Sequence, residues 1–203
     1  MTDISFFHSG NNAQLIHKVM QLGYIRESDY ILDATYGRGL WWTALPGFNV
    51  TGNDLYDGYV EFGYDFRELP ETWDDAFDVV AYDPPYRLNG RPDPAFDGRY
   101  GTAERTTVES RIRLIYDGFF GVVRCVKPGG YLLVKLQDQV VSGRVHWLTV
   151  GCLEAAKLLA ELGTHLALVD RFDMPPARPQ PSGRRQVHAR RGSTLLVFQK
   201  KGK

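Results

Sequence analysis

Short apolar segments alternate with longer amphipathic segments along most of this chain, and this alternation restricts the possible folds more than any other feature. The short segments have the length and content of buried strands and lie at residues 30–33, 48–53, 77–82, 131–136, 166–170 and 194–198. Apolar residues recur at helical spacing in residues 12–22, 108–126 and 146–162, and a short helix is expected to begin at 40–42. Strands separated by helices predict an α/β fold, in which a mostly parallel sheet carries helices on both faces.

The length and composition of the chain predict one domain over residues 1–203. A hydrophobic content of 43% and a charged content of 24% are typical of a globular protein. Met1–Ser5 places no basic region ahead of an apolar run, and no stretch is long and apolar enough to span a bilayer. We therefore expect a cytoplasmic protein without a membrane partner. Cys125 and Cys152 lack metal-ligand spacing, which predicts unpaired thiols and no metal site.

The formal charge of zero conceals a basic stretch late in the sequence. Residues 178–203 contain eight of the 24 Lys and Arg residues and no Asp or Glu, which leaves 16 basic and 24 acidic residues before them. The net charge is therefore +8 in this stretch and −8 in the residues that precede it. We expect the basic segment, residues 174–192, to form a surface for a polyanion, and the alternative is a solvated segment without a specific role.

A glycine turn directly follows the first expected strand. Gly37 and Gly39 allow a sharp turn and a close approach of the backbone to a ligand above the strand ends. A dinucleotide-binding turn is the alternative, but Trp42 occupies the position of its third glycine, and a strand-ending carboxylate at Asp33 would repel a pyrophosphate. A carboxylate suits a ligand with a cationic amino-acid end, and S-adenosylmethionine is such a ligand.

Polar residues after the second strand and before the third extend this expected cofactor site. Asn53 and Asp54 follow the second strand, about twenty residues after Asp33, where a carboxylate accepts hydrogen bonds from ribose hydroxyls. Asp65 lies in a turn from which it can accept a hydrogen bond from an adenine amino group, and Phe66 can pack on the adenine face.

The segment Asp83-Pro84-Pro85-Tyr86 ends the third strand and predicts the chemistry. Proline cannot donate to a sheet, and its fixed φ holds the neighbouring carbonyls in defined directions. The Asp83 carboxylate and the Pro84 carbonyl can each accept one N–H of an exocyclic base amine, which directs the nitrogen lone pair and stabilises the developing charge. Tyr86 can stack on a base that has left its duplex. These residues predict methyl transfer by alignment, without a covalent enzyme intermediate.

The order of these two motifs resembles the amino-methyltransferase family that forms N6-methyladenine or N4-methylcytosine. The resemblance covers about residues 5–137 and implies a Rossmann-like seven-stranded methyltransferase fold. Phe7 and His8 are similar to the N-terminal cofactor motif of that family. Ala34 and Thr35 depart from the Pro-Phe pair that usually follows the strand-ending Asp. The resemblance implies target-amine binding by Asp83, Pro84 and Tyr86, and S-adenosylmethionine binding by Asp33, Gly37, Gly39, Asp54 and Asp65. We expect the catalytic segment to include Pro85 as well, and the cofactor site to include also Phe7, His8, Ala34, Tyr36, Asn53 and Phe66.

We expect short elements to recognise the polymer, because the 203 residues leave no room for a large target-recognition domain. Residues 87–106 form a long segment rich in Gly, Pro, Asp and Arg, which we expect to be a mobile active-site loop. The candidates for contact with nucleic acid are Lys135 at the end of a strand and, in the basic segment, Arg184, Arg185, Arg190 and Arg191.

The preferred hypothesis is a DNA adenine-N6 methyltransferase that acts as a monomer or weak dimer. The motif does not distinguish DNA from RNA, so an RNA methyltransferase acting on adenine or guanine amines stays open. Methylation of a protein glutamine is less favoured, because such enzymes usually carry Asn at the position of Asp83. A catalytically silent nucleic-acid-binding module of the same fold is the alternative from another functional class.

Overall fold

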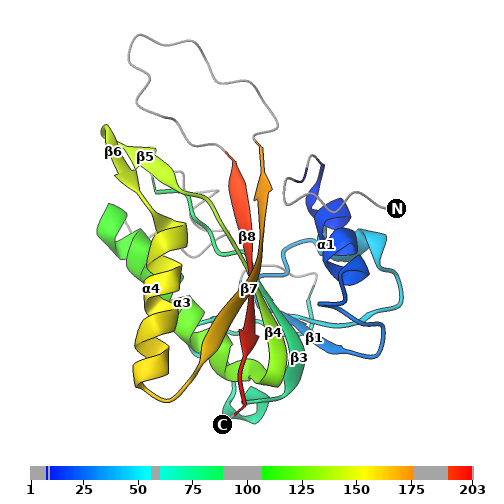
Figure 1. The fold of residues 1–203 in the computed structure, drawn as a ribbon. Helices are drawn as coiled ribbons and strands as arrows, with labels where there is room; N and C mark the ends of the chain where they lie inside the picture. Colours follow the sequence, from blue (N-terminus) through cyan, green and yellow to red (C-terminus); the bar gives the residue numbers. More distant parts are fainter. Residues whose placement is uncertain (1–7, 9, 56–59, 89–106, 176–191, 203) are drawn as a thin grey trace.

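A six-stranded sheet forms the centre of the computed structural model, which describes residues 8, 10–55, 60–88, 107–175 and 192–202 (Figure 1). The strand order is β2-β1-β3-β4-β8-β7. The first four strands of this order run parallel, and β8 is antiparallel to both of its neighbours. The strands are β1 (Tyr30–Asp33), β2 (Asn49–Gly52), β3 (Phe77–Tyr82), β4 (Val126–Leu136), β7 (Leu166–Met174) and β8 (Ser193–Lys200).

Helices cover both faces of this sheet, as the alternation of segments predicts. Two long helices lie on one face, and the N-terminal helix with a short 3-10 helix lies on the other (Figure 1). No helix within the described ranges has both the length and the apolar character needed to cross a membrane. The helices are α1 (Asn12–Gln21), α3 (Val108–Cys125) and α4 (Leu148–Glu161), and the 3-10 helices are η1 (Trp42–Ala44) and η2 (Glu71–Trp73).

Alternation along the central strands divides the apolar interior into two cores. In β3, Val80 and Tyr82 face α3 and α4, whereas Val79 and Ala81 face α1 and η1. In β4, Leu133 faces α1 and η1 in the same way. The next residues of the same parity are Asp83 after β3 and Lys135 in β4. The strand pattern therefore directs these two side chains to the α1 side of the sheet.

The described residues contain six strands of the main sheet where the resemblance implies seven. Between β2 and β3, the described residues form one isolated bridge, from Asn53 to Phe62. Aromatic rings fill this region instead, because Trp73 makes edge contacts with Phe62, Tyr64 and Phe77. The α/β class with a mostly parallel sheet and helices on both faces is nevertheless confirmed.

The sequence did not predict the hairpin that follows β4. Strands β5 (Gln139–Val141) and β6 (Arg144–His146) pair antiparallel and stand above the start of α4 in Figure 1. Ser142 and Gly143 form the two-residue turn with φ of 50° and 78°, as a type I′ hairpin requires. His146 therefore lies in a strand, although its segment was expected to be the beginning of a helix.

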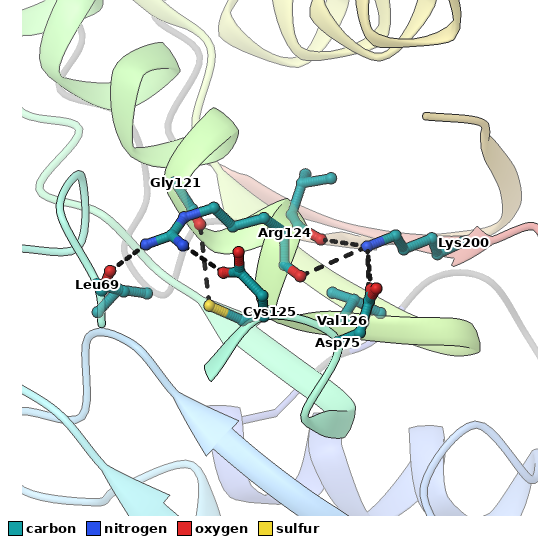
Figure 2. Close-up of polar contacts among 9 residues, drawn as sticks. Leu69, Asp75, Gly121, Arg124, Cys125, Val126 and Lys200 are labelled. Atoms are coloured by element: carbon teal, nitrogen blue, oxygen red, sulfur yellow. Dashed lines mark hydrogen bonds and ion pairs between the residues drawn. The ribbon is translucent and has the colours of Figure 1, made fainter. Parts of the chain in front are cut away.

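Helix α3 passes into β4 without a loop, and Lys200 holds this junction (Figure 2). Its ammonium donates to the carbonyl oxygens of Val123, Arg124 and Val126 at 3.3, 3.5 and 2.8 Å. It also forms an ion pair with Asp75 at 2.7 Å. These contacts satisfy carbonyl groups that the end of a helix leaves without intrahelical partners. The Arg124 guanidinium contacts the Leu69 carbonyl on the other side of the same junction (Figure 2).

Two segments to which the sequence assigns a function lie mostly outside the described residues. These are the expected active-site loop, of which only 87 and 88 are described, and the basic segment, of which 176–191 are not. The basic segment connects β7 to β8. Its two ends are fixed by the pairing of Met174 with Ser193, and Thr194 pairs with Leu136 at the carboxyl end of β4. Both ends therefore lie at the edge of the sheet where the parallel strands end.

Replacing Lys200 by Met should lower the free energy of unfolding by about 2 kcal/mol, because the carbonyls of the α3–β4 junction lose a charged donor. Urea denaturation followed by circular dichroism measures this change. Lys201→Met is the matched control, since Lys201 is exposed and its ammonium contacts only the Gln199 side chain and solvent in the described structure. An equal effect of both substitutions would show that Lys200 does not hold the junction.

Candidate active site

Three charged side chains meet at the carboxyl edge of adjacent parallel strands. Asp33 ends β1, Asp83 follows β3, and Lys135 lies near the end of β4. The register pairs Asp33 with Ala81, and Tyr82 with Val134, which places Asp83 beside Lys135. Asp33 and Lys135 expose only 3% and 5% of their surface. Charges buried this deeply need partners, and the structure supplies them.

Asp83 is held by a buried ion pair and by an indole. Lys135 Nζ lies 3.1 Å from Oδ2 of Asp83, and Trp41 Nε1 donates to the same oxygen at 3.3 Å. The backbone N–H of Asp83 donates to the Thr35 hydroxyl at 2.8 Å. Burial raises the pKa of Asp83, and Lys135 and Trp41 limit that rise. The carboxylate side chain still exposes 22% of its surface, as contact with a substrate requires.

Lys135 remains a cation despite its burial. Burial alone would lower its pKa, but Asp83 and Tyr86 outweigh that effect, so that the pKa of Lys135 is raised. The sequence suggested Lys135 as a contact for the nucleic-acid strand. The structure instead directs its ammonium into the site, where it pairs with Asp83.

Asp33 is held by the second of two consecutive tryptophans. Trp42 Nε1 donates to Oδ2 of Asp33 at 2.7 Å, and the Thr35 backbone N–H donates to Oδ1 at 3.1 Å. Burial raises the pKa of Asp33 to about 7; these two donors oppose the rise, and the nearby charges of Asp83 and Asp54 add to it. From the sequence, Trp42 served only as an argument against a dinucleotide site. In the structure its indole is a hydrogen-bond donor to the carboxylate that ends β1.

The glycine turn has the backbone that the sequence predicts. Gly37 and Gly39 adopt φ of 54° and 65°, in the left-handed region that favours glycine. The Gly37 N–H donates to Oδ2 of Asp54 at 2.9 Å, so Asp54 fixes the turn. A Cβ at Gly39 would lie 2.5 Å from the Tyr36 hydroxyl, whereas a Cβ at Gly37 would meet nothing within 4 Å. The backbone at Gly37 is therefore open to the approach of a ligand.

Asn53 and Ala34 lie beneath this turn and not on its surface. Asn53 exposes 0% and Ala34 exposes 1% of its surface. The Asn53 amide donates to the carbonyls of Ala34 and Tyr64 at 3.2 and 3.0 Å, and its oxygen accepts the Tyr64 N–H at 2.9 Å. Both residues were expected to touch a cofactor. The structure gives them a supporting position, in which they join the turn to the neighbouring loop.

Asp65 and Phe66 also have partners within the protein. The Asp65 carboxylate accepts from Arg67 Nε at 2.9 Å. The Phe66 ring makes an edge contact with Tyr82 at 5.4 Å between centroids, and a Cβ at Gly118 of α3 would approach it to 2.5 Å. Phe66 therefore packs between the sheet and α3, and its stacking on an adenine stays a prediction.

The segment after Asp83 is held by side chains from three other elements, β4, β5 and α3. Lys135 Nζ lies 3.3 Å from the Tyr86 hydroxyl and 5.6 Å from the centroid of the Tyr86 ring. The buried Gln139 of β5 donates to the Tyr86 carbonyl and accepts the Leu88 N–H at 3.1 Å. The buried Arg111 of α3 donates to the Arg87 carbonyl at 2.8 Å. Pro84 is buried and Pro85 half-buried within this segment.

The remaining expected site residues are His8, which precedes α1, and residues outside the described ranges. His8 is buried, with its ring nitrogen 3.2 Å from the Asn11 carbonyl and its backbone N–H donating to the Asp173 carbonyl of β7 at 3.0 Å. Burial lowers the pKa of His8. No group of three potential metal-ligating side chains occurs among the residues that the structure describes. Phe7, Arg184, Arg185, Arg190 and Arg191 lie outside the described residues.

The fold is similar to that of solved methyltransferase structures. The N-methyltransferase NodS from Bradyrhizobium japonicum WM9 has a TM-score of 0.52 at 12% identity, and the match covers 100% of both chains. TrmN from Thermus thermophilus has a TM-score of 0.53 at 17% identity, and NSun6 from Pyrococcus horikoshii with SFG has 0.58 at 16%. These two matches cover 93% and 96% of this chain but 48% and 53% of the other. No protein-family model and no curated protein sequence matches the chain. The structural similarities show a Rossmann-like methyltransferase fold.

Replacing Trp42 by Phe should raise the pKa of Asp33 above its value of about 7, because the ionised carboxylate loses a donor. The folded-state pKa already exceeds that of the unfolded chain, so ionisation of Asp33 costs stability as the pH rises toward 7. The substitution should therefore destabilise the protein by about 1–3 kcal/mol, and more at pH 8 than at pH 5.

The titration is measured from the carboxyl carbon resonance of Asp33 across this pH range. Trp147→Phe, which changes an indole that is 44% exposed, is the control and should leave the titration in place. Superimposable Asp33 titrations for Trp42→Phe and the wild type would contradict the assigned contact.

Proposed function

We propose that this protein is an S-adenosylmethionine-dependent methyltransferase that modifies an exocyclic amine of a nucleic-acid base, with adenine N6 in DNA as the preferred target. The observation that carries the proposal is the Asp83 carboxylate, which is fixed at the strand edge and still accessible, with Pro84 and Tyr86 in the same rigid segment. The Rossmann-like methyltransferase fold is consistent with it.

The cofactor proposal rests on the glycine turn and on the carboxylates around it. The buried Asp33 has a pKa near 7, so a cationic amino group of a ligand would favour its ionised form. The open backbone at Gly37 permits close approach, and Asp54 stands beside it. When bound, S-adenosylmethionine supplies a methyl group activated by a sulfonium. The side chains proposed to hold it are those of Asp33, Asp54, Asp65 and Tyr36, with Phe7 and His8 from the preceding segment.

The chain's own groups would prepare the amine. The Asp83 carboxylate and the Pro84 carbonyl each accept one N–H, so that the nitrogen lone pair points away from both acceptors and toward the methyl donor. The bound cofactor would supply the methyl group and keep the electron pair of the C–S bond, and the target nitrogen would become positively charged as the N–C bond forms. The nitrogen then loses one proton, for which Asp83 is the adjacent acceptor and water is the final one. Tyr86 would stack on the base and hold its plane.

Contact with the polymer is proposed for the basic segment between β7 and β8. Both of its described ends lie at the strand edge that carries Asp83 and Lys135. Its four arginines, which are adjacent in sequence at 184–185 and at 190–191, would neutralise phosphates without recognising the base sequence. An RNA target is the alternative. A silent binding module is disfavoured, because a protein that only binds nucleic acid does not need a partly exposed carboxylate such as Asp83 at this position.

Asp83→Ala should lower methyl transfer at least about 100-fold, because the amine loses its charged acceptor, while cofactor affinity stays within about threefold. The assay combines methyl-labelled S-adenosylmethionine with separate DNA and RNA pools, followed by nucleoside analysis. Asp117→Ala is the control, since that carboxylate lies on the exposed side of α3. Equal turnover by wild type and Asp83→Ala would refute the role of Asp83. Failure of the wild type to bind the cofactor at millimolar concentration would favour the silent module.

Replacing Arg184, Arg185, Arg190 and Arg191 together by Ala should weaken binding to DNA and flatten its dependence on salt. The slope of log affinity against log salt concentration should decrease by about 0.9 for each phosphate that the variant no longer neutralises. Fluorescence anisotropy with a labelled oligonucleotide at several salt concentrations measures the slope. Arg113→Ala, with a side chain 80% exposed on α3, is the control. Overlapping titrations for the wild type and the fourfold variant would remove the basic segment from the binding surface.

A further inference from the structure

Lys135 is a buried cation at a place where the sheet could hold an apolar residue. The side chain at position 133, two residues earlier on the same face of β4, is a leucine with 0% exposure. Transfer of an ammonium group out of water costs several kcal/mol unless a charged partner compensates for it. In the described residues the polar partners of this ammonium are the Asp83 carboxylate and the Tyr86 hydroxyl. Both belong to the segment proposed to bind the target base.

The contacts of Asp83 are unequal at its two oxygens. Oδ2 lies within 3.1 Å of Lys135 Nζ and 3.3 Å of Trp41 Nε1, whereas Oδ1 lies 3.5 Å from Lys135 Nζ. Two donors from different elements therefore fix one oxygen and the plane of the carboxylate. The other oxygen is the better placed of the two to accept an N–H from outside.

We propose that Lys135 is a positioning residue, which joins Asp83 and Tyr86 into one unit and, together with Trp41, orients Asp83 so that Oδ1 receives the target amine. This inference rests on the proposed function and adds a residue that the motif Asp-Pro-Pro-Tyr does not contain. Lys135 acts through Asp83 and Tyr86 and is not itself assigned a contact with the base.

The charge of Lys135 has a consequence for pH dependence. The ammonium favours the ionised form of Asp83, which is the form that accepts the amine N–H. Among the described residues, the neutral Trp41 indole before η1 donates to the Asp83 carboxylate, and the Thr35 hydroxyl after β1 accepts its backbone N–H. The Tyr86 hydroxyl contacts Lys135, and the second carboxylate, Asp33, is close enough for its pKa to respond to the charge of Asp83. The charge of Asp83 in turn raises the pKa of Asp33. Burial raises the pKa of Asp83, and Lys135 is the charged group that opposes this rise.

The test compares Lys135→Met, Lys135→Gln and Lys135→Arg with the wild-type protein. Removal of the charge in the Met and Gln variants should move the acid limb of kcat/KM to higher pH by about one pH unit or more, because Asp83 protonates more readily. The Arg variant keeps the charge and should restore the wild-type limb. Trp41→Phe removes a neutral donor from the same oxygen, so its limb should move in the same direction by less. The Gln variant retains an N–H donor and serves if the Met variant does not fold.

A second measurement separates this inference from the proposed function. The carboxyl carbon resonance of Asp83, assigned with Asp83→Asn, is titrated in the cofactor-free protein and requires no activity. A titration midpoint that is higher in Lys135→Gln than in the wild type supports the role of Lys135 even if no nucleic acid is methylated, in which case only the proposed function fails. A wild type that methylates DNA or RNA, with both the acid limb and the Asp83 resonance unmoved in Lys135→Met and Lys135→Gln, would overturn the inference.

Discussion

The cost of burying carboxylates at the edge of the sheet determines how the rest of the site is built. Asp33 and Asp83 end neighbouring strands, which lie only about 4.8 Å apart in a sheet. Two consecutive residues that precede and begin η1, Trp41 and Trp42, each reach one of these carboxylates with an indole N–H. Indoles satisfy the carboxylate oxygens without adding charge and fill the core under α1 with apolar surface. The tryptophan pair therefore links the glycine turn, the sheet and the N-terminal helix.

The two ends of the parallel strands, which form opposite edges of the sheet, have different roles. At the edge where β4 begins, Lys200 and Arg124 close the junction with α3 by satisfying carbonyl groups. At the opposite edge the strands end in charged residues and irregular segments, which are held by side chains such as Gln139 and Arg111. A sheet with parallel strands concentrates ligand contacts at its carboxyl edge.

The sequence predicted those features that depend on short-range order. The strand ends at Asp33 and Asp83 and the positive φ of Gly37 follow from local patterns, and the structure contains them. Local patterns could not predict the roles of Trp42 and Phe66, because their partners lie on other elements. Trp42 donates to Asp33 at the end of β1, and Phe66 packs against Tyr82 of β3. The β5–β6 hairpin was missed because its strands are very short and its turn, with Ser before Gly, carries only a weak signal.

The partners of the basic residues reduce the number of cations in the basic stretch that are available to a polyanion. Lys200 belongs to the basic stretch of the sequence, yet its ammonium serves the α3–β4 junction. The cationic groups that can meet a polyanion from this stretch are then mainly the arginines between residues 178 and 191. The preceding part of the chain is net acidic and would repel a nucleic acid elsewhere on its surface. If the proposed function holds, attraction by these arginines and repulsion elsewhere would orient a nucleic acid toward the edge that carries Asp83, even without recognition of its sequence.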